Sequence, residues 1–287
     1  MLNSYIFQDE SKVFVPTIDH VVYKSDCREV MQRMRDCAIS IDLTVTSPPY
    51  DNLRTYNDSS SWGKEIFKDI AHLLYEITTE GGVLVWVVGD ATQKGSETGT
   101  SFKQALFFKE IGFNLHDTMI YEKNSSSFPA SRTGKRYTQI FEYMFVFTKG
   151  KVKTGNLICD KKNKWAGYTN WGVNTQYNAN GSMKETNDIK PVPDFSVRTN
   201  IWKYTTGFNI NRGKHPAVFP YKLAEDHILS WSNEGDLVFD PFLGSGTTMF
   251  AALKNNRKFI GCEIDSTYFK SISENYSYYV QKLGNNS

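Results

Sequence analysis

Cysteines are scarce in this sequence, and the few present are widely spaced. The 287 residues include only four, with no C-x-x-C pair and no paired histidine nearby. Structural zinc sites and disulfide frameworks both depend on closely or regularly spaced cysteines. We therefore expect no metal, no disulfide framework and a reducing, cytoplasmic compartment.

Long apolar runs and a strong net charge are missing too. No stretch approaches the length of a membrane span, and the N-terminal residues lack the basic-then-apolar order of a signal peptide. The 33 basic and 31 acidic residues leave a formal net charge of only +2. A polyanionic partner would have to be bound by local clusters of lysine and arginine.

Strand-like and helix-like patterns alternate through most of the chain. Apolar runs typical of strands occur at 21–23, 41–46, 83–88, 116–122, 140–148, 237–239 and 258–263. Helical periodicity occupies 30–34, 66–77, 102–111, 223–231 and 268–279, and Gly81-Gly82 is expected to end the second of these helices. This alternation predicts an α/β fold with a mostly parallel sheet and helices on both faces.

Residues 150–200 have a different character. They are rich in Asn, Lys, Thr, Gly and Trp and show no sustained periodicity. We expect 1–149 and 214–287 to form one α/β domain, and 150–213 to be a small irregular region inserted into it.

A glycine-containing turn follows the strand at 237–239. It reads Asp240-Pro241-Phe242-Leu243-Gly244-Ser245-Gly246-Thr247-Thr248. Glycines let the backbone approach a ligand closely, and a following helix presents free N–H groups. Glu263 ends the next strand and is placed to accept hydrogen bonds from ribose hydroxyls. The turn lacks the third glycine of a dinucleotide site and the lysine of a P-loop. A turn that binds nothing is the alternative, which the Asp-Pro lead-in and Glu263 disfavour.

A second motif ends the strand 41–46, with the sequence Thr46-Ser47-Pro48-Pro49-Tyr50. Two prolines cannot continue a parallel ladder, so the chain must leave the sheet there. Ligands of open α/β sheets bind outside the carboxyl ends of strands, which is where this segment lies.

Together the two motifs resemble those of amino-methylating DNA methyltransferases in the permuted order called the β group. The resemblance covers 20–148 and 214–280, and it implies a Rossmann-like methyltransferase sheet with an antiparallel hairpin and an irregular recognition lobe. It implies S-adenosylmethionine as cofactor, without a metal. The catalytic residues it implies are Ser47, Pro48, Pro49 and Tyr50. The cofactor-binding residues it implies are Asp26, Thr46, His215, Pro216, Asp240, Pro241, Phe242, Gly244, Ser245, Gly246, Thr247 and Glu263.

The chemistry of these residues agrees with amino methylation. An exocyclic amine is a poor nucleophile, and the Ser47 hydroxyl oxygen with the Pro48 carbonyl could hold its two hydrogens. Tyr50 would stack on a base removed from the duplex. Cytosine-C5 methylation needs a cysteine after proline, and no Pro-Cys dipeptide occurs. Serine at position 47 favours N4 of cytosine, with N6 of adenine as the alternative.

Polar segments rich in basic residues are candidates for DNA contacts. Six lysines between 149 and 164, followed by Trp165, Tyr168 and Trp171, make 150–213 the candidate target-recognition region. The candidate DNA-binding residues are Arg54, Lys123, Arg132, Lys135, Arg136, Lys161, Lys162 and Lys164. A solvated surface is the alternative for each of them.

The expected partner is double-stranded DNA, with a companion restriction endonuclease and no membrane, in a prokaryotic cell or a phage-infected host. Monomer and homodimer both remain open. Three alternatives also remain: an RNA methyltransferase, a protein methyltransferase, and a DNA-binding relative without catalytic activity.

Overall fold

The computed structural model describes residues 6–9, 20–49, 63–124, 135–169, 177–183, 190–205 and 220–284. The chain forms two compact units: unit 1 comprises Met1–Asn156 and Asn200–Ser287, and unit 2 comprises Leu157–Thr199. No helix within the described ranges is long and apolar enough to cross a membrane.

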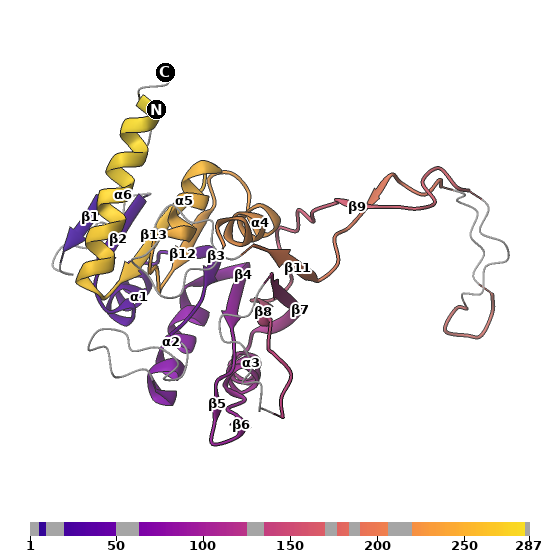
Figure 1. Ribbon diagram of the computed structural model, residues 1–287, viewed down its shortest axis with the longest axis horizontal. Helices are drawn as coiled ribbons and strands as arrows, with labels where there is room; N and C mark the ends of the chain where they lie inside the picture. The colour runs from indigo at the N-terminus through magenta and orange to yellow at the C-terminus, as the bar shows by residue number, and fades with distance from the viewer. Residues whose placement is uncertain are drawn as a thin grey trace. The chain divides into compact units, whose positions relative to one another are not determined.

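Unit 1 is built on a mixed sheet with nine strands in the described part of the chain (Figure 1). In spatial order the strands are β1 (Ile6–Asp9), β2 (His20–Lys24), β13 (Lys258–Glu263), β12 (Leu237–Asp240), β3 (Ile41–Thr46), β4 (Thr78–Val88), β8 (Phe141–Thr148), β7 (Asn114–Lys123) and β11 (Ile201–Tyr204). Only β8 runs antiparallel to its neighbours, and with β7 it forms the expected hairpin. The predicted α/β fold is confirmed.

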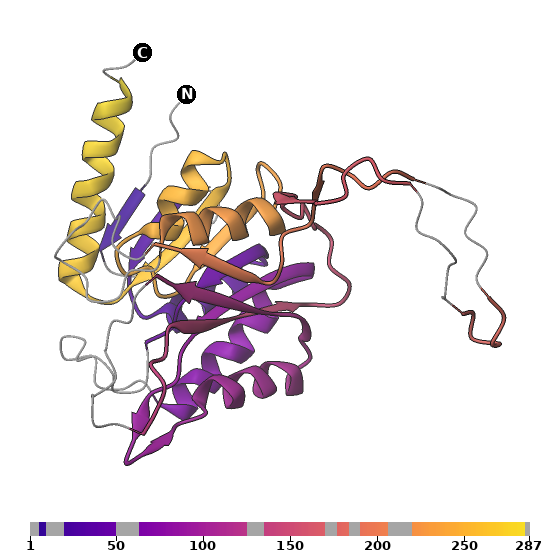
Figure 2. The same cartoon turned by 45° about the vertical axis from the view of Figure 1, so that its right-hand side comes forward.

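Helices cover both faces of this sheet (Figure 2). One face carries α1 (Cys27–Asp36), α2 (Lys64–Ile77) and α3 (Thr100–Glu110), and the other carries α4 (Tyr221–Trp231) and α5 (Thr247–Lys254), while α6 (Ser266–Gly284) packs against β13. Leu84, Trp86 and Val88 alternate along β4 and share a buried cluster with α1, α2 and α3. Strand side chains point to opposite faces in turn, so the intervening valines face the other layer. This explains why β4 is apolar at every position from Val83 to Val88.

The helix α2 does not end at the glycine pair, as the sequence led us to expect. It ends at Ile77, and the chain passes directly into β4, which contains Gly81 and Gly82. The pairing of β3 with β4 shifts register there, between Ile41 and Leu43. Gly81 has φ +79°, and a Cβ at this position would lie 2.8 Å from the Lys153 Cβ. Gly81 and Gly82 therefore lie at an irregularity in the strand pairing, and Gly81 allows the chain to pass close to Lys153.

Unit 2 contains little regular structure. The strands β9 (Lys161–Lys162) and β10 (Phe195–Ser196) pair antiparallel, and Gly167 occupies a turn with φ +81°. None of its described residues, 157–169, 177–183 and 190–199, is buried. Unit 2 falls within the irregular region expected at 150–213, and its described residues form no core.

Candidate active site

The predicted functional loops follow neighbouring strands at one edge of the sheet. β2, β13, β12 and β3 are hydrogen-bonded in that order and are all parallel, so their carboxyl ends share an edge. At this edge lie Asp26 after β2, Glu263 ending β13, the glycine turn after β12, and Ser47-Pro48-Pro49 after β3. Five predicted site residues lie outside the described residues: Tyr50, Arg54, Arg132, His215 and Pro216.

Asp240 is a buried carboxylate that connects the two motifs. Its side chain is 1% exposed. Oδ1 accepts hydrogen bonds from the Thr46 hydroxyl at 2.7 Å and the Phe242 N–H at 3.0 Å, and Oδ2 accepts one from the Thr248 hydroxyl at 2.7 Å. Burial raises the pKa of Asp240 to about 6, against the effect of these three donors. The carboxylate therefore ties the end of β3 to the turn after β12 and to α5.

Glu263 is held in a similar way at the end of β13. Its Oε2 accepts the Gly244 N–H at 2.7 Å, and its Oε1 accepts the Asp265 N–H at 2.8 Å. Burial raises the pKa of Glu263 to about 7, although both N–H donors act to lower it. A carboxylate has about four acceptor sites, so this one retains capacity for further donors such as hydroxyls.

The glycine turn has a left-handed backbone at two positions and packs closely against the protein at Gly246. Gly244 has φ +56° and Gly246 has φ +85°, both in the left-handed region that glycine adopts without strain. A Cβ at Gly246 would lie 3.1 Å from Ile272 Cγ2 and 3.3 Å from Phe250 Cε2. The helix α5 begins immediately afterwards, at Thr247. The turn and the Glu263 carboxylate thus fit a ligand that carries vicinal hydroxyls, such as a nucleoside.

Asp26 caps the amino end of α1 and is bound by a neighbouring arginine. It accepts hydrogen bonds from the Arg28 backbone N–H at 2.9 Å and from Nη2 of the same residue at 2.7 Å. Burial alone would raise the pKa of Asp26, but the hydrogen bonds and charge of Arg28 hold it below its ordinary value. Arg28 also lies 3.7 Å from Asp69 on α2. The acidic side chain at this edge is therefore ionised and fixed in place.

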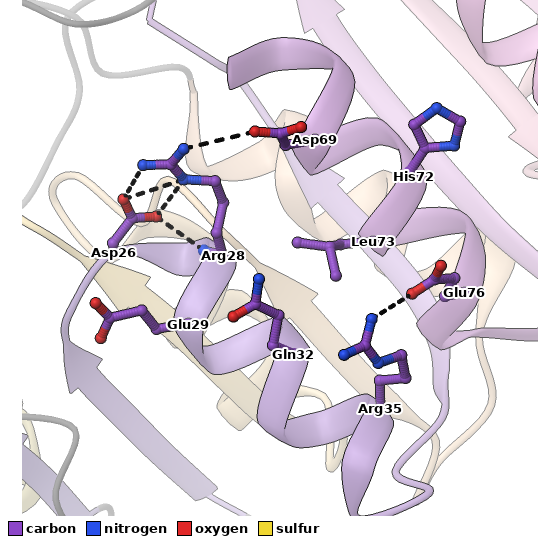
Figure 3. Close-up of a pocket in the computed structure, with 9 residues that line it drawn as sticks. All are labelled: Asp26, Arg28, Glu29, Gln32, Arg35, Asp69, His72, Leu73 and Glu76. Carbon is purple, nitrogen blue, oxygen red and sulfur yellow. Dashed lines mark hydrogen bonds and ion pairs between the residues drawn. The ribbon is translucent and has the colours of Figure 1, made fainter. Parts of the chain in front are cut away.

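A charged cavity of about 450 Å³ runs along α1 and α2 (Figure 3). Asp26 and Arg28 lie at one end, and the ion pair of Arg35 with Glu76 lies at the other. Neither the glycine turn nor Glu263 lines this cavity. It is therefore a groove between two helices, and of the predicted site residues only Asp26 lines it.

The predicted DNA-binding residues differ in their exposure and in whether they form ion pairs within the protein. Lys123 forms an ion pair with Glu142 at 2.5 Å and is only 16% exposed, which does not favour a phosphate contact. Arg136 lies 3.7 Å from Glu97 and also donates to the Gly95 carbonyl. Three lysines of unit 2 are exposed, and within the described residues no ion pair engages them: Lys161, Lys162 and Lys164. Lys135 is exposed as well.

The lysines that precede unit 2 do not belong with that group. The Lys149 ammonium donates to the carbonyls of Tyr75 and Thr78, at the carboxyl end of α2, and Lys153 lies 3.8 Å from Asp42 at the start of β3. The start of β3 is the sheet edge opposite the motif loops. The basic patch expected from the sequence is therefore divided between unit 1 and unit 2, and within unit 1 Lys149 caps the carboxyl end of a helix.

Comparison of the sequence with known proteins identifies the family to which the chain belongs. A model described as DNA methylase, of the N6/N4 methyltransferase type, matches residues 41–274. An orphan methyltransferase of Bacillus amyloliquefaciens, M.BamHII, is 54% identical over 254 residues, covering 87% of this chain and 92% of the relative. This chain belongs to the DNA methylase family.

Solved structures show the same fold for this methylase. The cytosine-N4-specific PvuII DNA methyltransferase has a TM-score of 0.63 at 20% identity, covering 88% of this chain and 84% of that one. The complex of M1.HpyAVI with S-adenosylmethionine has a TM-score of 0.59 at 23% identity, covering 88% and 97%. The described residues of the methylase contain no cluster of three or more side chains able to hold a metal ion.

Two residues of the methylase site were not foreseen from the sequence. Thr248 donates to Asp240, and Arg28 fixes Asp26. The double threonine after Gly246 was visible as a pattern, but its hydrogen-bond partner was not. Arg28 stands two residues after a helix-capping aspartate, and no general pattern distinguishes it from an ordinary surface arginine.

Proposed function

We propose that this methylase transfers a methyl group from S-adenosylmethionine to N4 of cytosine at a specific sequence of double-stranded DNA. The observation that carries the proposal is the adjacency of two loops, Ser47-Pro48-Pro49 after β3 and the glycine turn after β12, on neighbouring parallel strands. When bound at the glycine turn, S-adenosylmethionine supplies an electrophilic methyl group. Methyl transfer requires an acceptor held beside it, and the Ser47 loop follows a strand that neighbours β12.

The acceptor amine is activated by orientation. Its lone pair is delocalised into the base, so a group that holds both amine hydrogens directs the lone pair outward. The Ser47 hydroxyl oxygen and the Pro48 carbonyl supply two such acceptors in sequence. A fixed near-attack geometry can contribute several orders of magnitude in rate. The base must leave the duplex for this, and Tyr50 is proposed to stack on it. No covalent enzyme–base intermediate forms.

Cofactor binding is assigned to the loops at the same edge. The Glu263 carboxylate accepts the ribose hydroxyls, and the Asp26 carboxylate lies at the adenine end. The backbone from Pro241 to Thr247 is assigned to the same site, and Gly244 and Gly246 permit the left-handed conformations that shape this turn. His215 and Pro216 are proposed at the methionine end.

Methylation of adenine N6 is the second candidate. The matching family model covers both amino-methylating types. Both reactions use the same acceptor pair and the same donor, so the choice depends on the shape of the base pocket. Ser47, where the adenine-specific type more often has aspartate, favours cytosine.

DNA binding is assigned chiefly to unit 2. Counted from the sequence, residues 157–199 contain six basic and four acidic residues, so unit 2 carries +2, the formal net charge of the whole chain. Exposed Lys161, Lys162 and Lys164 stand close in sequence to Trp165, which is 64% exposed. Lysines suit phosphate contacts, and exposed aromatic rings suit contacts with bases. The proposed setting is a restriction–modification system.

The test is product analysis. The methylase is incubated with labelled S-adenosylmethionine and mixed-sequence duplex DNA, which is then digested and resolved by mass spectrometry. N4-methylcytosine supports the proposal, and N6-methyladenine favours the second candidate. An absence of labelled nucleoside contradicts both. Ser47→Ala is the matched control, and it should lose turnover much more than cofactor affinity.

A further inference from the structure

The buried carboxylate of Asp240 lies between the strand that carries Ser47 and the glycine turn. Thr46 is the residue directly before Ser47, and Thr248 lies in the first turn of α5, two residues after Gly246. Both threonine side chains are 0% exposed. Each hydroxyl donates to Asp240 at 2.7 Å, and the Thr248 hydroxyl also lies 3.4 Å from the Val45 carbonyl oxygen. Because both side chains are fully buried, neither is exposed for direct contact with a cofactor.

The carboxylate depends on these donors. A buried charge is costly unless it is hydrogen-bonded, and in the described part of the chain the donors to Asp240 are all neutral: two hydroxyls and the Phe242 N–H. If one hydroxyl is removed, the carboxylate must move toward the remaining donors or toward water. The turn that bears Phe242 is bonded to the same carboxylate, so the turn moves with it.

We infer that Asp240, through Thr46 and Thr248, is a positioning residue that fixes the Ser47 loop in register with the cofactor turn. The inference rests on the proposed function, since it concerns the alignment of the two reactants. It also changes the role of Thr46, from a cofactor ligand to a group that acts through Asp240.

The strand provides its own matched control. Thr44 lies two residues before Thr46 on β3 and is 1% exposed, and its hydroxyl has no hydrogen-bond partner among the described residues. Thr44→Val removes a hydroxyl that makes no bond, whereas Thr46→Val removes one that binds Asp240. Thr46→Ser retains the hydroxyl and serves as the rescue variant.

The experiment measures three quantities for each variant: the melting temperature, the affinity for S-adenosylmethionine, and the methyl-transfer rate at saturating cofactor and DNA. We expect Thr46→Val to lower the saturated rate about tenfold or more, since small displacements of reacting groups have effects of that order. Thr46→Ser should stay within about threefold of the wild type, and Thr44→Val within about twofold, because neither loses the bond to Asp240.

A double-mutant cycle then tests the shared carboxylate. Because both hydroxyls act on Asp240, Thr46→Val and Thr248→Val together should reduce the rate by clearly less than the product of their separate effects. A purely structural role predicts lower melting temperatures with the saturated rate of Thr46→Val equal to that of Thr44→Val. That result, or independent effects in the cycle, would overturn the inference.

Failure of the proposed function would give a different experimental result from failure of the positioning inference. If the wild type binds S-adenosylmethionine but methylates no DNA, the proposed function fails. The positioning inference is then decided by cofactor affinity alone. Weaker binding by Thr46→Val than by Thr44→Val, restored in Thr46→Ser, supports it. Equal binding by all three contradicts it.

Discussion

Glu263 should make the stability of this methylase depend on pH. The side chain is 7% exposed, and burial raises its pKa from 4.5 to about 7. A raised pKa means that the native state binds the proton more tightly than the unfolded chain does. The stabilisation from that proton is fully present below pH 4.5 and is lost as the pH rises through about 7. The difference between the two pKa values corresponds to about 3 kcal/mol.

The variant Glu263→Gln removes this titration and retains a side chain of similar size. Urea unfolding of both proteins should be measured at several pH values from 4.5 to 8. Asp240, whose pKa is also raised, is present in both proteins and largely cancels from the comparison. We expect the wild type to lose ~3 kcal/mol more than the variant across this range.

Parallel stability curves for the two proteins would refute the reasoning, because they would show that Glu263 titrates alike in the folded and unfolded states. Cofactor affinity provides a second measure of the same group. Ribose hydroxyls donate most strongly to the ionised carboxylate, so wild-type affinity for S-adenosylmethionine should increase as the pH rises through about 7. The variant should show a flatter dependence.

Two further predictions concern the strand irregularity and unit 2. Gly81→Ala should lower the free energy of unfolding by about 2 kcal/mol in urea titrations, because alanine would adopt φ +79° and its Cβ would meet Lys153 at 2.8 Å. Gly95→Ala is the control, with the same φ and no atom within 4 Å, and an equal loss there would show that the contact with Lys153 costs nothing. Replacing Lys161, Lys162 and Lys164 by glutamine should make the dependence of log DNA affinity on log salt shallower by about 2–3. Replacing exposed Lys64, Lys109 and Lys270 changes the net charge equally and should leave the slope unchanged; an equal change would assign the effect to total charge.

The parts of the fold that could be predicted are those with strong local patterns. The bounds 41–46 and 258–263 agree with β3 and β13 because each strand is an apolar run that ends at a motif. Ser47 follows one predicted strand and Glu263 ends another, and parallel strands deliver their carboxyl ends to one side of a sheet. The order of these strands in the sheet came only from the structure.

The features that were missed depend on contacts between distant parts of the chain. β11 has only four residues and becomes a strand by pairing with β7, some 80 residues earlier. The bond from Thr46 to Asp240 spans 194 residues. Lys149 belongs to a basic run in the sequence, yet its ammonium is used by the carboxyl end of α2. The periodicity of apolar residues within a segment does not show which distant residues that segment will contact.

The lack of buried residues in the described part of unit 2 bears on how this methylase can diversify. The chain leaves unit 1 after Asn156 and returns at Asn200, and both residues are hydrogen-bonded within unit 1. Substitutions or length changes between them disturb no core packing among the described residues, so selection there is free of the constraint that governs the sheet. Under the proposed DNA-binding role of unit 2, a lineage can acquire a new target sequence by changing this segment while the methyl-transfer machinery stays constant.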